Sequence, residues 1–391
     1  MLPDLDTATI QDTELITDPS LISEATLQAI QDRLSLGDLP RHVYTASLNV
    51  GGVAVADSFE KYLSADAYQS SHLKRALITP LHFHFSEDED SKRLQELADR
   101  EHFNVGTFIH QCVLEPTLFG RVIIEPKASL STTEGANSLI TFWKSLLADS
   151  DYLVTFQGEE LPGALFIDCA QNAVVKSGLS LDKIDGKREL IALFRKHSGI
   201  IPVSEENFLK IKIIKKHLDA YADGIIFKLL RHSKREISFY HDRVDDSIKI
   251  KVRPDAIQFA ENIGVNAIIS LKSTAAEDLR SFYRHCAEYH YDLTEALYQD
   301  TISAVTGRTF DTTIMIMLQT VEPYAIAMLL WDREDLAVGR YKYQYAIESI
   351  RSAKQQGTYP GYESYADNPL GLICMKLPTW NGKELLPQLQ T

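Results

Sequence analysis

Basic charge, cysteine and long apolar runs are all scarce in this chain of 391 residues. The four cysteines include no CxxC pair, which argues against a zinc ribbon or a cysteine-ligated iron–sulfur cluster and favours a reducing compartment. The longest apolar run, residues 325–331, is far too short to cross a bilayer. The chain starts with acidic residues, whereas a secretory signal needs a basic start and an apolar core. We therefore expect a cytoplasmic protein without a membrane anchor.

Three common nucleotide and hydrolase signatures are also missing. The sequence contains no P-loop, no GxGxxG and no GxSxG. Their absence argues against nucleotide-driven motors, Rossmann-type enzymes and α/β-hydrolases. The remaining composition, 45% apolar and 24% charged, is typical of a folded globular protein with room for one to three domains.

The acidic charge is unevenly distributed. The net charge is −14, from 40 Lys and Arg against 54 Asp and Glu. Residues 1–40 hold eight acids and one base, whereas residues 183–235 hold thirteen bases and six acids. We interpret the first stretch as an acidic, flexible N-terminal arm. The second either presents the solvated faces of amphipathic helices or forms an electropositive surface for nucleic acid.

The expected elements divide the rest of the chain into three parts. Residues 41–126 are predicted to form a helical front end, and residues 127–202 an insertion or elaboration. Residues 203–391 are predicted to form the core. The helices expected before the core are 24–36, 70–79, 89–100, 104–114, 136–147 and 187–197, and a strand-like piece is expected at 163–168.

The apolar period changes from helical to alternating near residue 236. Two helices, 204–222 and 225–232, precede this point. The strands predicted beyond it are 237–240, 248–252, 265–271, 312–318 and 324–330, and the helices are 275–290, 292–304 and 333–353. This order predicts an α/β (α+β) layered core with a helical N-terminal part.

An aspartate and a lysine lie near the ends of neighbouring predicted strands. Asp255 belongs to Arg253-Pro254-Asp255, and Lys272 closes the next strand seventeen residues later. Both side chains can face one cleft, where a carboxylate holds a divalent cation and an ammonium group faces the attacking water. The arrangement suits metal-assisted hydrolysis of a phosphodiester. Such a pair near strand ends is also common without any function, so the spacing alone leaves a structural role open.

A second candidate metal site is His82-Phe83-His84. The two histidines alternate as in an extended segment, so both imidazoles could face one ion. No further ligand follows at a suitable spacing, which favours a surface or packing role.

Several short motifs occur in a characteristic order. They are Ser71-His72-Leu73-Lys74, Gly106-Thr107-Phe108-Ile109-His110, Leu114-Glu115-Pro116, Glu236, Arg253-Pro254-Asp255, Leu271-Lys272-Ser273-Thr274, Tyr291-Asp292 with Tyr298, and Leu377-Pro378-Thr379-Trp380. Over roughly residues 70–380 the chain resembles the RecE-type (exonuclease VIII) nucleases. These belong to the PD-(D/E)XK superfamily, which includes lambda exonuclease and the RecB nuclease domains.

The resemblance implies a mixed central sheet flanked by helices and a role for each matched residue. His110 and Asp255 would hold the metal, Lys272 would orient or deprotonate the water, and Glu236 would lie at the cleft edge. DNA contacts are expected from Tyr298, Arg253, Thr294 and Ser273. The implied activity is 5′-to-3′ digestion of one strand of linear duplex DNA, with Mg²⁺ or Mn²⁺, in recombination. A ring-shaped homo-oligomer and a RecT-like single-strand annealing partner are also implied.

Two positions depart from the family pattern. Ser270-Leu271-Lys272 replaces Asp/Glu-x-Lys, so the second metal carboxylate is missing, and Thr294 stands where the QxxxY element has glutamine. Losing a carboxylate weakens the binding of a hard cation unless another acid replaces it. Some superfamily members take this acid from the following helix. Here Glu288 is the first candidate, with Asp292 and Glu295 behind it; otherwise all three are solvated helix acids.

Two functions therefore remain open at the level of sequence. The first is a metal-dependent exonuclease that degrades linear duplex DNA from its ends. The second is a catalytically impaired relative that binds DNA ends or a recombination partner. A structural protein with the same fold and no DNA contact is a third, and the basic stretch argues against it.

Overall fold

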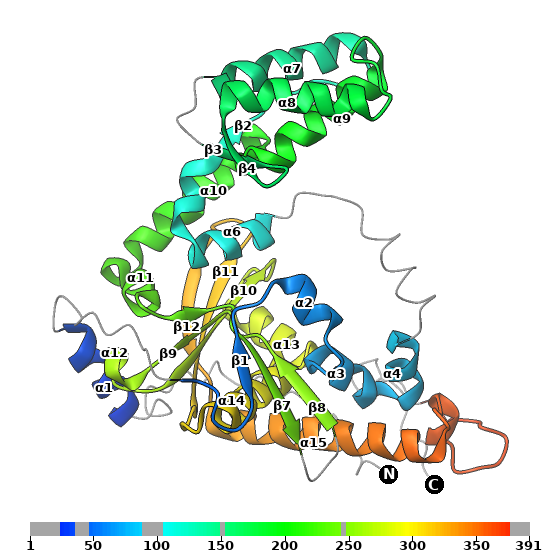
Figure 1. The fold of residues 1–391 in the computed structure, drawn as a ribbon. Helices are drawn as coiled ribbons and strands as arrows, with labels where there is room; N and C mark the ends of the chain where they lie inside the picture. Colours follow the sequence, from blue (N-terminus) through cyan, green and yellow to red (C-terminus); the bar gives the residue numbers. More distant parts are fainter. Residues whose placement is uncertain (1–23, 36–46, 88–104, 149–152, 244–247, 376–391) are drawn as a thin grey trace, which may run out of the picture.

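The computed structural model describes residues 24–35, 47–87, 105–148, 153–243 and 248–375 (Figure 1). Most of the acidic arm and the helix expected at 89–100 lie outside these residues. The helix expected at 24–36 is confirmed as α1 (Glu24–Ser35). Within the described ranges, no helix is long and apolar enough to cross a membrane.

A five-stranded mixed sheet lies at the centre of the described structure. Its strand order is β12-β11-β10-β9-β6. Strands β10 (Ala267–Thr274) and β11 (Thr312–Gln319) are parallel, and the other pairs are antiparallel. The remaining strands are β12 (Ile326–Leu330), β9 (Ala256–Gln258) and β6 (Lys234–Arg235). Strand β11 is buried along its whole length, as expected for a central strand that is covered on both faces.

Helices cover both faces of this sheet because successive side chains of a strand point in opposite directions. Ile269 and Leu271 pack in one apolar cluster with side chains of α6, α10 and α11. Ile268 packs in another with side chains of α14 and α15. These helices are α6 (Val105–Leu114), α10 (Glu205–Ala220), α11 (Ile225–Leu230), α14 (Tyr291–Thr306) and α15 (Arg333–Gln356). The mixed sheet between helices confirms the predicted fold class.

A smaller antiparallel sheet joins the front end of the chain to the core. Its order is β1-β7-β8, and it packs against α14. The strands are β1 (Val53–Val55), β7 (Ser238–Arg243) and β8 (Ile248–Val252), and the adjoining helices are α2 (Phe59–Ser64), α3 (Ser70–Ile78) and α4 (Pro80–Glu87). The extended segment expected at His82-Phe83-His84 is wrong, because these residues lie inside α4. Pro80 can occupy the first position of a helix, where its missing N–H costs nothing.

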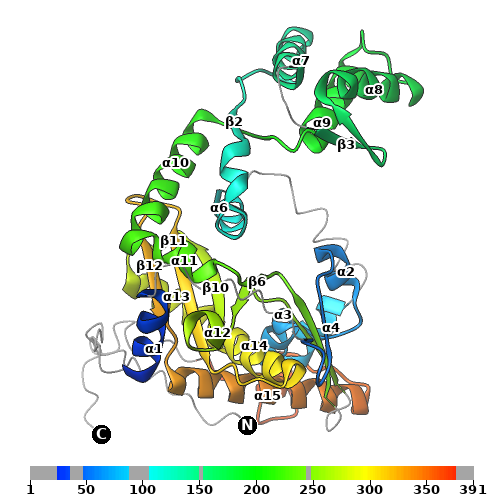
Figure 2. The same cartoon turned by 60° about the vertical axis from the view of Figure 1, so that its left-hand side comes forward.

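Residues 133–200 fold around an apolar cluster of their own. They form α7 (Thr133–Ala148), β3 (Leu153–Phe156), β4 (Glu159–Pro162), α8 (Gly163–Lys176) and α9 (Ile184–His197). This lobe projects from the rest of the structure in both views (Figures 1 and 2). The chain enters it through β2 (Val122–Ile124) and leaves through β5 (Ile201–Val203), which pair in parallel.

The strand-like reading of residues 163–168 is wrong, because they begin helix α8. The buried residues of α8 include Phe166, Ile167, Ala170 and Val174. These residues are one, three and four positions apart, which is a helical spacing. The six residues 163–168 cover too little of this pattern to distinguish a helix from a buried strand.

The elements expected after residue 236 are confirmed with small shifts at their ends. The five predicted strands correspond to β7, β8, β10, β11 and β12, and the three predicted helices to α13 (Leu279–Glu288), α14 and α15. Strands β6 and β9 and the short helix α12 (Ala260–Ile263) were not expected. They have two to four residues each, too few to show a period.

Candidate active site

Asp255 and Lys272 are brought together by the pairing of β9 with β10. Strand β9 begins directly after Asp255, and Ala256 pairs with Ile269 in the antiparallel register. Oδ2 of Asp255 accepts a hydrogen bond of 2.6 Å from the backbone N–H of Leu271. The carboxylate is thereby fixed beside the Ser270-Leu271-Lys272 segment. Its side chain is 19% exposed and that of Lys272 is 20% exposed, so the pair is neither on the surface nor in a dry core.

His110 reaches the same carboxylate from helix α6. Its Nε2 lies 3.2 Å from Oδ1 of Asp255. This contact falls outside hydrogen-bond geometry, and the buried Nε2 has no other hydrogen-bond partner among the described residues. Adjacent ligands of an octahedral Mg²⁺ or Mn²⁺ ion at about 2.1 Å would be about 3.0 Å apart. The spacing of these two atoms therefore fits two neighbouring ligands of one cation.

Charges across the pocket favour the ionised forms of Asp255 and Lys272. Burial alone would raise the pKa of Asp255, but Lys272, His110 and the Leu271 amide together hold it below its usual value. Burial would lower the pKa of Lys272, but the carboxylates of Asp255 and Glu295 raise it above its usual value. Lys272 therefore carries a positive charge at neutral pH.

Glu295 occupies the space beside Ser270, where the usual acidic ligand is missing. Its side chain is 0% exposed. Oε2 accepts a hydrogen bond of 2.7 Å from the Ser270 hydroxyl, and Oε1 lies 3.9 Å from Nζ of Lys272. Oε1 has no hydrogen-bond partner in the described part of the chain. Burial raises the pKa of Glu295 even though Lys272 and Ser270 act in the opposite direction.

The other two candidate acids lie elsewhere. Glu288 is exposed at the end of α13. Asp292 is directed towards α15, where it accepts a hydrogen bond of 2.7 Å from Nζ of Lys342. Of the three acids considered, the structure thus brings Glu295 to Ser270 and Lys272.

The remaining expected residues surround the pocket at different depths. Glu236 is exposed between β6 and β7, and its backbone N–H donates to the Asp255 carbonyl at 3.1 Å. Ser273 is exposed on β10, whereas Thr294 is buried on α14. The Tyr298 hydroxyl donates to the Arg253 carbonyl at 3.4 Å, and burial raises its pKa well above the usual value. The structure does not bring the Glu236 side chain into contact with His110, Asp255 or Lys272 by a hydrogen bond or ion pair.

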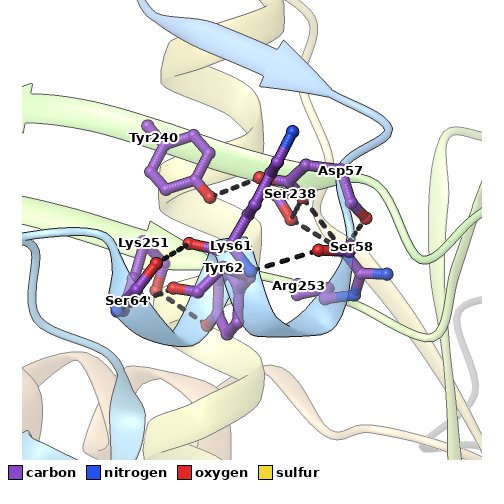
Figure 3. A network of polar contacts seen from close by, with 9 residues as sticks. All are labelled: Asp57, Ser58, Lys61, Tyr62, Ser64, Ser238, Tyr240, Lys251 and Arg253. Carbon is purple, nitrogen blue, oxygen red and sulfur yellow. Dashed lines mark hydrogen bonds and ion pairs between the residues drawn. The ribbon is translucent and has the colours of Figure 1, made fainter. Parts of the chain in front are cut away.

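Arg253 is held by a polar network (Figure 3). Its Nη1 lies 3.1 Å from Oδ1 of Asp57 and donates to the Ser238 hydroxyl at 2.9 Å. Asp57 also accepts hydrogen bonds from the hydroxyls of Ser238 and Tyr240. The side chains of Asp57 and Arg253 are each 12% exposed. The network ties the segment before α2 to the backbone that leads into Asp255.

Lys251, drawn in the same view, fixes the other end of α2 (Figure 3). Its Nζ donates to the carbonyls of Tyr62, Leu63 and Ala65 at 2.8, 2.9 and 2.7 Å. These are orphan carbonyls at the end of the helix, which a cation satisfies well. The front end is therefore anchored at the start of α2 to β7 and Arg253, and at the end of α2 to β8.

We expect Asp57→Ala to lower the free energy of unfolding by about 2–3 kcal/mol, because Arg253 would lose its counter-ion in a largely buried place. Burial alone would raise the pKa of Asp57, but Ser238, Tyr240 and Arg253 hold it below its usual value. The stabilisation is thus present above about pH 4 and is lost as the pH falls through the lowered pKa. Urea unfolding of wild type and variant at pH 7 and pH 3 measures both effects. An equal difference at the two pH values would contradict the role of the ionised carboxylate.

Neither Asp57 nor Lys74 was singled out for a role from the sequence. Asp57 belongs to no motif, and its partner Ser238 is 181 residues away. Lys74 ends the motif Ser71-His72-Leu73-Lys74, but nothing in the sequence indicates which way the side chain points. The structure places it near Glu295 and Lys272, whose charges act on its pKa.

The donor set suits a divalent cation that also uses water or substrate oxygens. Within the described ranges, no group of three or more His, Cys, Asp or Glu side chains encloses a cation site. His110 and Asp255 supply two converging ligand atoms. Mg²⁺ is commonly held by one or two carboxylates together with substrate phosphates, so a two-residue site fits it. The imidazole nitrogen is a better ligand for Mn²⁺ and later transition metals than for Mg²⁺.

Residues 200–367 match a family described as a PDDEXK-like domain of unknown function (DUF3799). This stretch is similar to PDDEXK-like domains. The matched stretch contains Asp255, Lys272 and Glu295, while His110 and Lys74 precede it. The match supports a relationship to the PD-(D/E)XK superfamily.

Two solved structures are similar to the chain at low TM-scores. One, described as a "Putative exonuclease" from Eubacterium rectale, has a TM-score of 0.32 and 16% identity, and the match covers 54% of this chain and 76% of that one. The other, SSO0001, has a TM-score of 0.22 and 13% identity, and the match covers 68% and 98%. No curated protein matches the chain.

Proposed function

We propose that this protein is a metal-dependent nuclease that hydrolyses phosphodiester bonds of linear duplex DNA. The observation that carries the proposal is the convergence of His110, Asp255, Lys272 and Glu295 from a front-end helix, two strand ends and a core helix. Structural residues rarely place a buried imidazole nitrogen 3.2 Å from a carboxylate oxygen, next to a charged lysine and a second, buried acid. Ser270 stands where the family pattern has an acid, and the buried carboxylate of Glu295 lies next to it. This nearby acid favours a working enzyme over an impaired relative.

The residues divide the chemical work as follows. His110 and Asp255 would hold a divalent cation, which when bound lowers the pKa of a water and neutralises a phosphoryl oxygen. Lys272 keeps its proton at neutral pH, so it stabilises the charge that builds up on the phosphate rather than accepting a proton. Glu295 holds the Ser270 hydroxyl through Oε2 and orients Lys272 through Oε1, and a second lone pair of Oε1 would accept from a water or bind the cation. Tyr298 holds the Arg253 carbonyl and with it the approach to Asp255.

The finer assignment follows the motif resemblance. We propose a RecE-type exonuclease that digests one strand from a DNA end in the 5′-to-3′ direction during recombination. Mg²⁺ or Mn²⁺ would be the cofactor. A ring-shaped homo-oligomer, a RecT-like annealing partner and a cytoplasmic location complete this proposal.

The decisive experiment incubates the full chain with end-labelled linear duplex DNA and, separately, with the same DNA as a closed circle. With Mg²⁺ or Mn²⁺ we expect release of label from the linear form, an intact circle, and no release after addition of EDTA. Labelling either the 5′ or the 3′ end reads the direction. No degradation of the linear DNA with either cation would overturn the nuclease proposal, and nicking of the circle would overturn the requirement for ends.

A further inference from the structure

Lys74 reaches the candidate active site from helix α3. Its Nζ lies 5.3 Å from the centre of the Tyr291 ring. Nζ of Lys272 lies 5.5 Å from the centre of the same ring. Tyr291 begins helix α14, one helical turn before Glu295. Two ammonium groups from different parts of the chain thus meet at one aromatic ring next to the pocket.

Lys74 has no carboxylate partner among the described residues, although two carboxylates are near. Glu295 is engaged by Ser270 and Lys272, and Asp292 by Lys342. Burial and the charge of Lys272 lower the pKa of Lys74 to about 8, and Glu295 and Asp292 compensate only in part. A desolvated cation–π contact contributes about 2 kcal/mol, but it supplies no formal negative charge against the neighbouring ammonium of Lys272. Within the part of the chain described, Lys74 thus lacks an ion pair of its own, and an anionic ligand can supply one.

We propose that Lys74 binds a phosphate of the DNA backbone next to the phosphodiester group that lies at Asp255 and Lys272. The inference rests on the proposed nuclease function and extends the phosphate-binding surface from the sheet to the front end of the chain. An ammonium group is a point charge that contacts phosphate without reading a base. Lys74 therefore contributes to affinity and to the position of the strand, equally for every sequence.

The test measures binding of the full chain to a fluorescent linear duplex without divalent cations, between about 50 and 200 mM salt. Lys74→Met removes the charge and keeps the stem that packs on Tyr291. Each phosphate contact contributes about 0.9 to the slope of log affinity against log salt. Over this fourfold rise in salt, the wild type should therefore lose about threefold more affinity than Lys74→Met. Lys249→Met, an exposed lysine of β8, is the matched control and should keep the wild-type slope.

Lys74→Arg separates charge from packing, and thermal unfolding shows whether each variant is folded. We expect Lys74→Arg to keep the wild-type slope. Equal slopes for wild type and folded Lys74→Met would overturn the assignment of Lys74 and leave the proposed nuclease function intact. The same loss in Lys74→Arg and Lys74→Met would also overturn it, because the charge would then not be responsible. A wild type that binds no duplex at low salt would overturn the proposed function together with the inference.

Discussion

Lys272→Ala should slow the cleavage of linear duplex DNA by about a thousandfold while the protein still binds the DNA. In the proposed function the ammonium group faces the phosphate on which negative charge develops, and removing one preorganised donor of this kind costs about 10²–10³ in rate. The group is held in place, since Asp255 and Glu295 both raise its pKa and Oε1 of Glu295 lies 3.9 Å from Nζ. Single-turnover cleavage with Mg²⁺ or Mn²⁺, at saturating protein, measures the step.

Lys249→Ala provides the comparison for this variant, because Lys249 is also a strand lysine but is exposed on β8. It should cleave at the wild-type rate. If Lys272→Ala retained more than a tenth of the wild-type rate, the catalytic centre would have to lie elsewhere. If it lost binding and cleavage in proportion, Lys272 would be a binding residue rather than a catalytic one.

Glu295→Gln should lower the cleavage rate by about a hundredfold without lowering stability. The amide keeps an oxygen for the Ser270 hydroxyl, but it removes the negative charge that orients Lys272 and assists cation binding. Burial raises the pKa of Glu295, which means that the folded protein holds the ionised acid at a cost. Removing this charge should therefore leave the free energy of unfolding at pH 7 unchanged or raise it. Loss of activity together with retained or higher stability is the pattern of a functional residue.

Glu288→Gln is the matched control, since Glu288 is exposed at the end of α13 and was the first acid considered from the sequence. It should leave the cleavage rate unchanged. Ser270→Asp is expected to impair the enzyme, because it would place a second carboxylate against the buried Glu295. If Ser270→Asp cleaved DNA faster than the wild type, Glu295 would not be the acid that substitutes for the carboxylate missing at position 270. The reverse result, with Glu288→Gln inactive and Glu295→Gln active, would reassign the acid.

The sequence was sufficient for the parts of the structure that repeat a local pattern. Strands β10 and β11 are eight residues long and contain the apolar runs 267–269 and 314–318, and α14 and α15 show helical spacing over sixteen and twenty-four residues. The convergence of Asp255 and Lys272 was expected, but not the strand that causes it: the strand predicted before Asp255 is β8 of the smaller sheet, and the neighbour of β10 is β9. Short elements such as β6 and β9 carry no period and were missed.

The choice of acid could not be made from the sequence because it depends on the turn between α13 and α14. Ser270 and Lys272 are two residues apart on β10, so they point to the same side of the sheet, which α14 covers. His290 adopts a left-handed backbone conformation with φ of 49° between the two helices, and this directs Glu295 inwards. No spacing rule distinguishes Glu288, Asp292 and Glu295 before that turn is known. Lys74 and Asp57 depend in the same way on contacts far along the chain.

The parallel pairing of β2 with β5 allows the lobe of residues 133–200 to be removed or replaced as one unit. Because Val122 pairs with Ile201, the points where the chain leaves and re-enters the rest of the structure are neighbours in space. Adjacent ends are the condition under which a whole module can be deleted, lengthened or grafted by one splice without shifting the scaffold on either side. Another domain or a tag could therefore replace the lobe, with His110 and the five-stranded sheet left outside the splice.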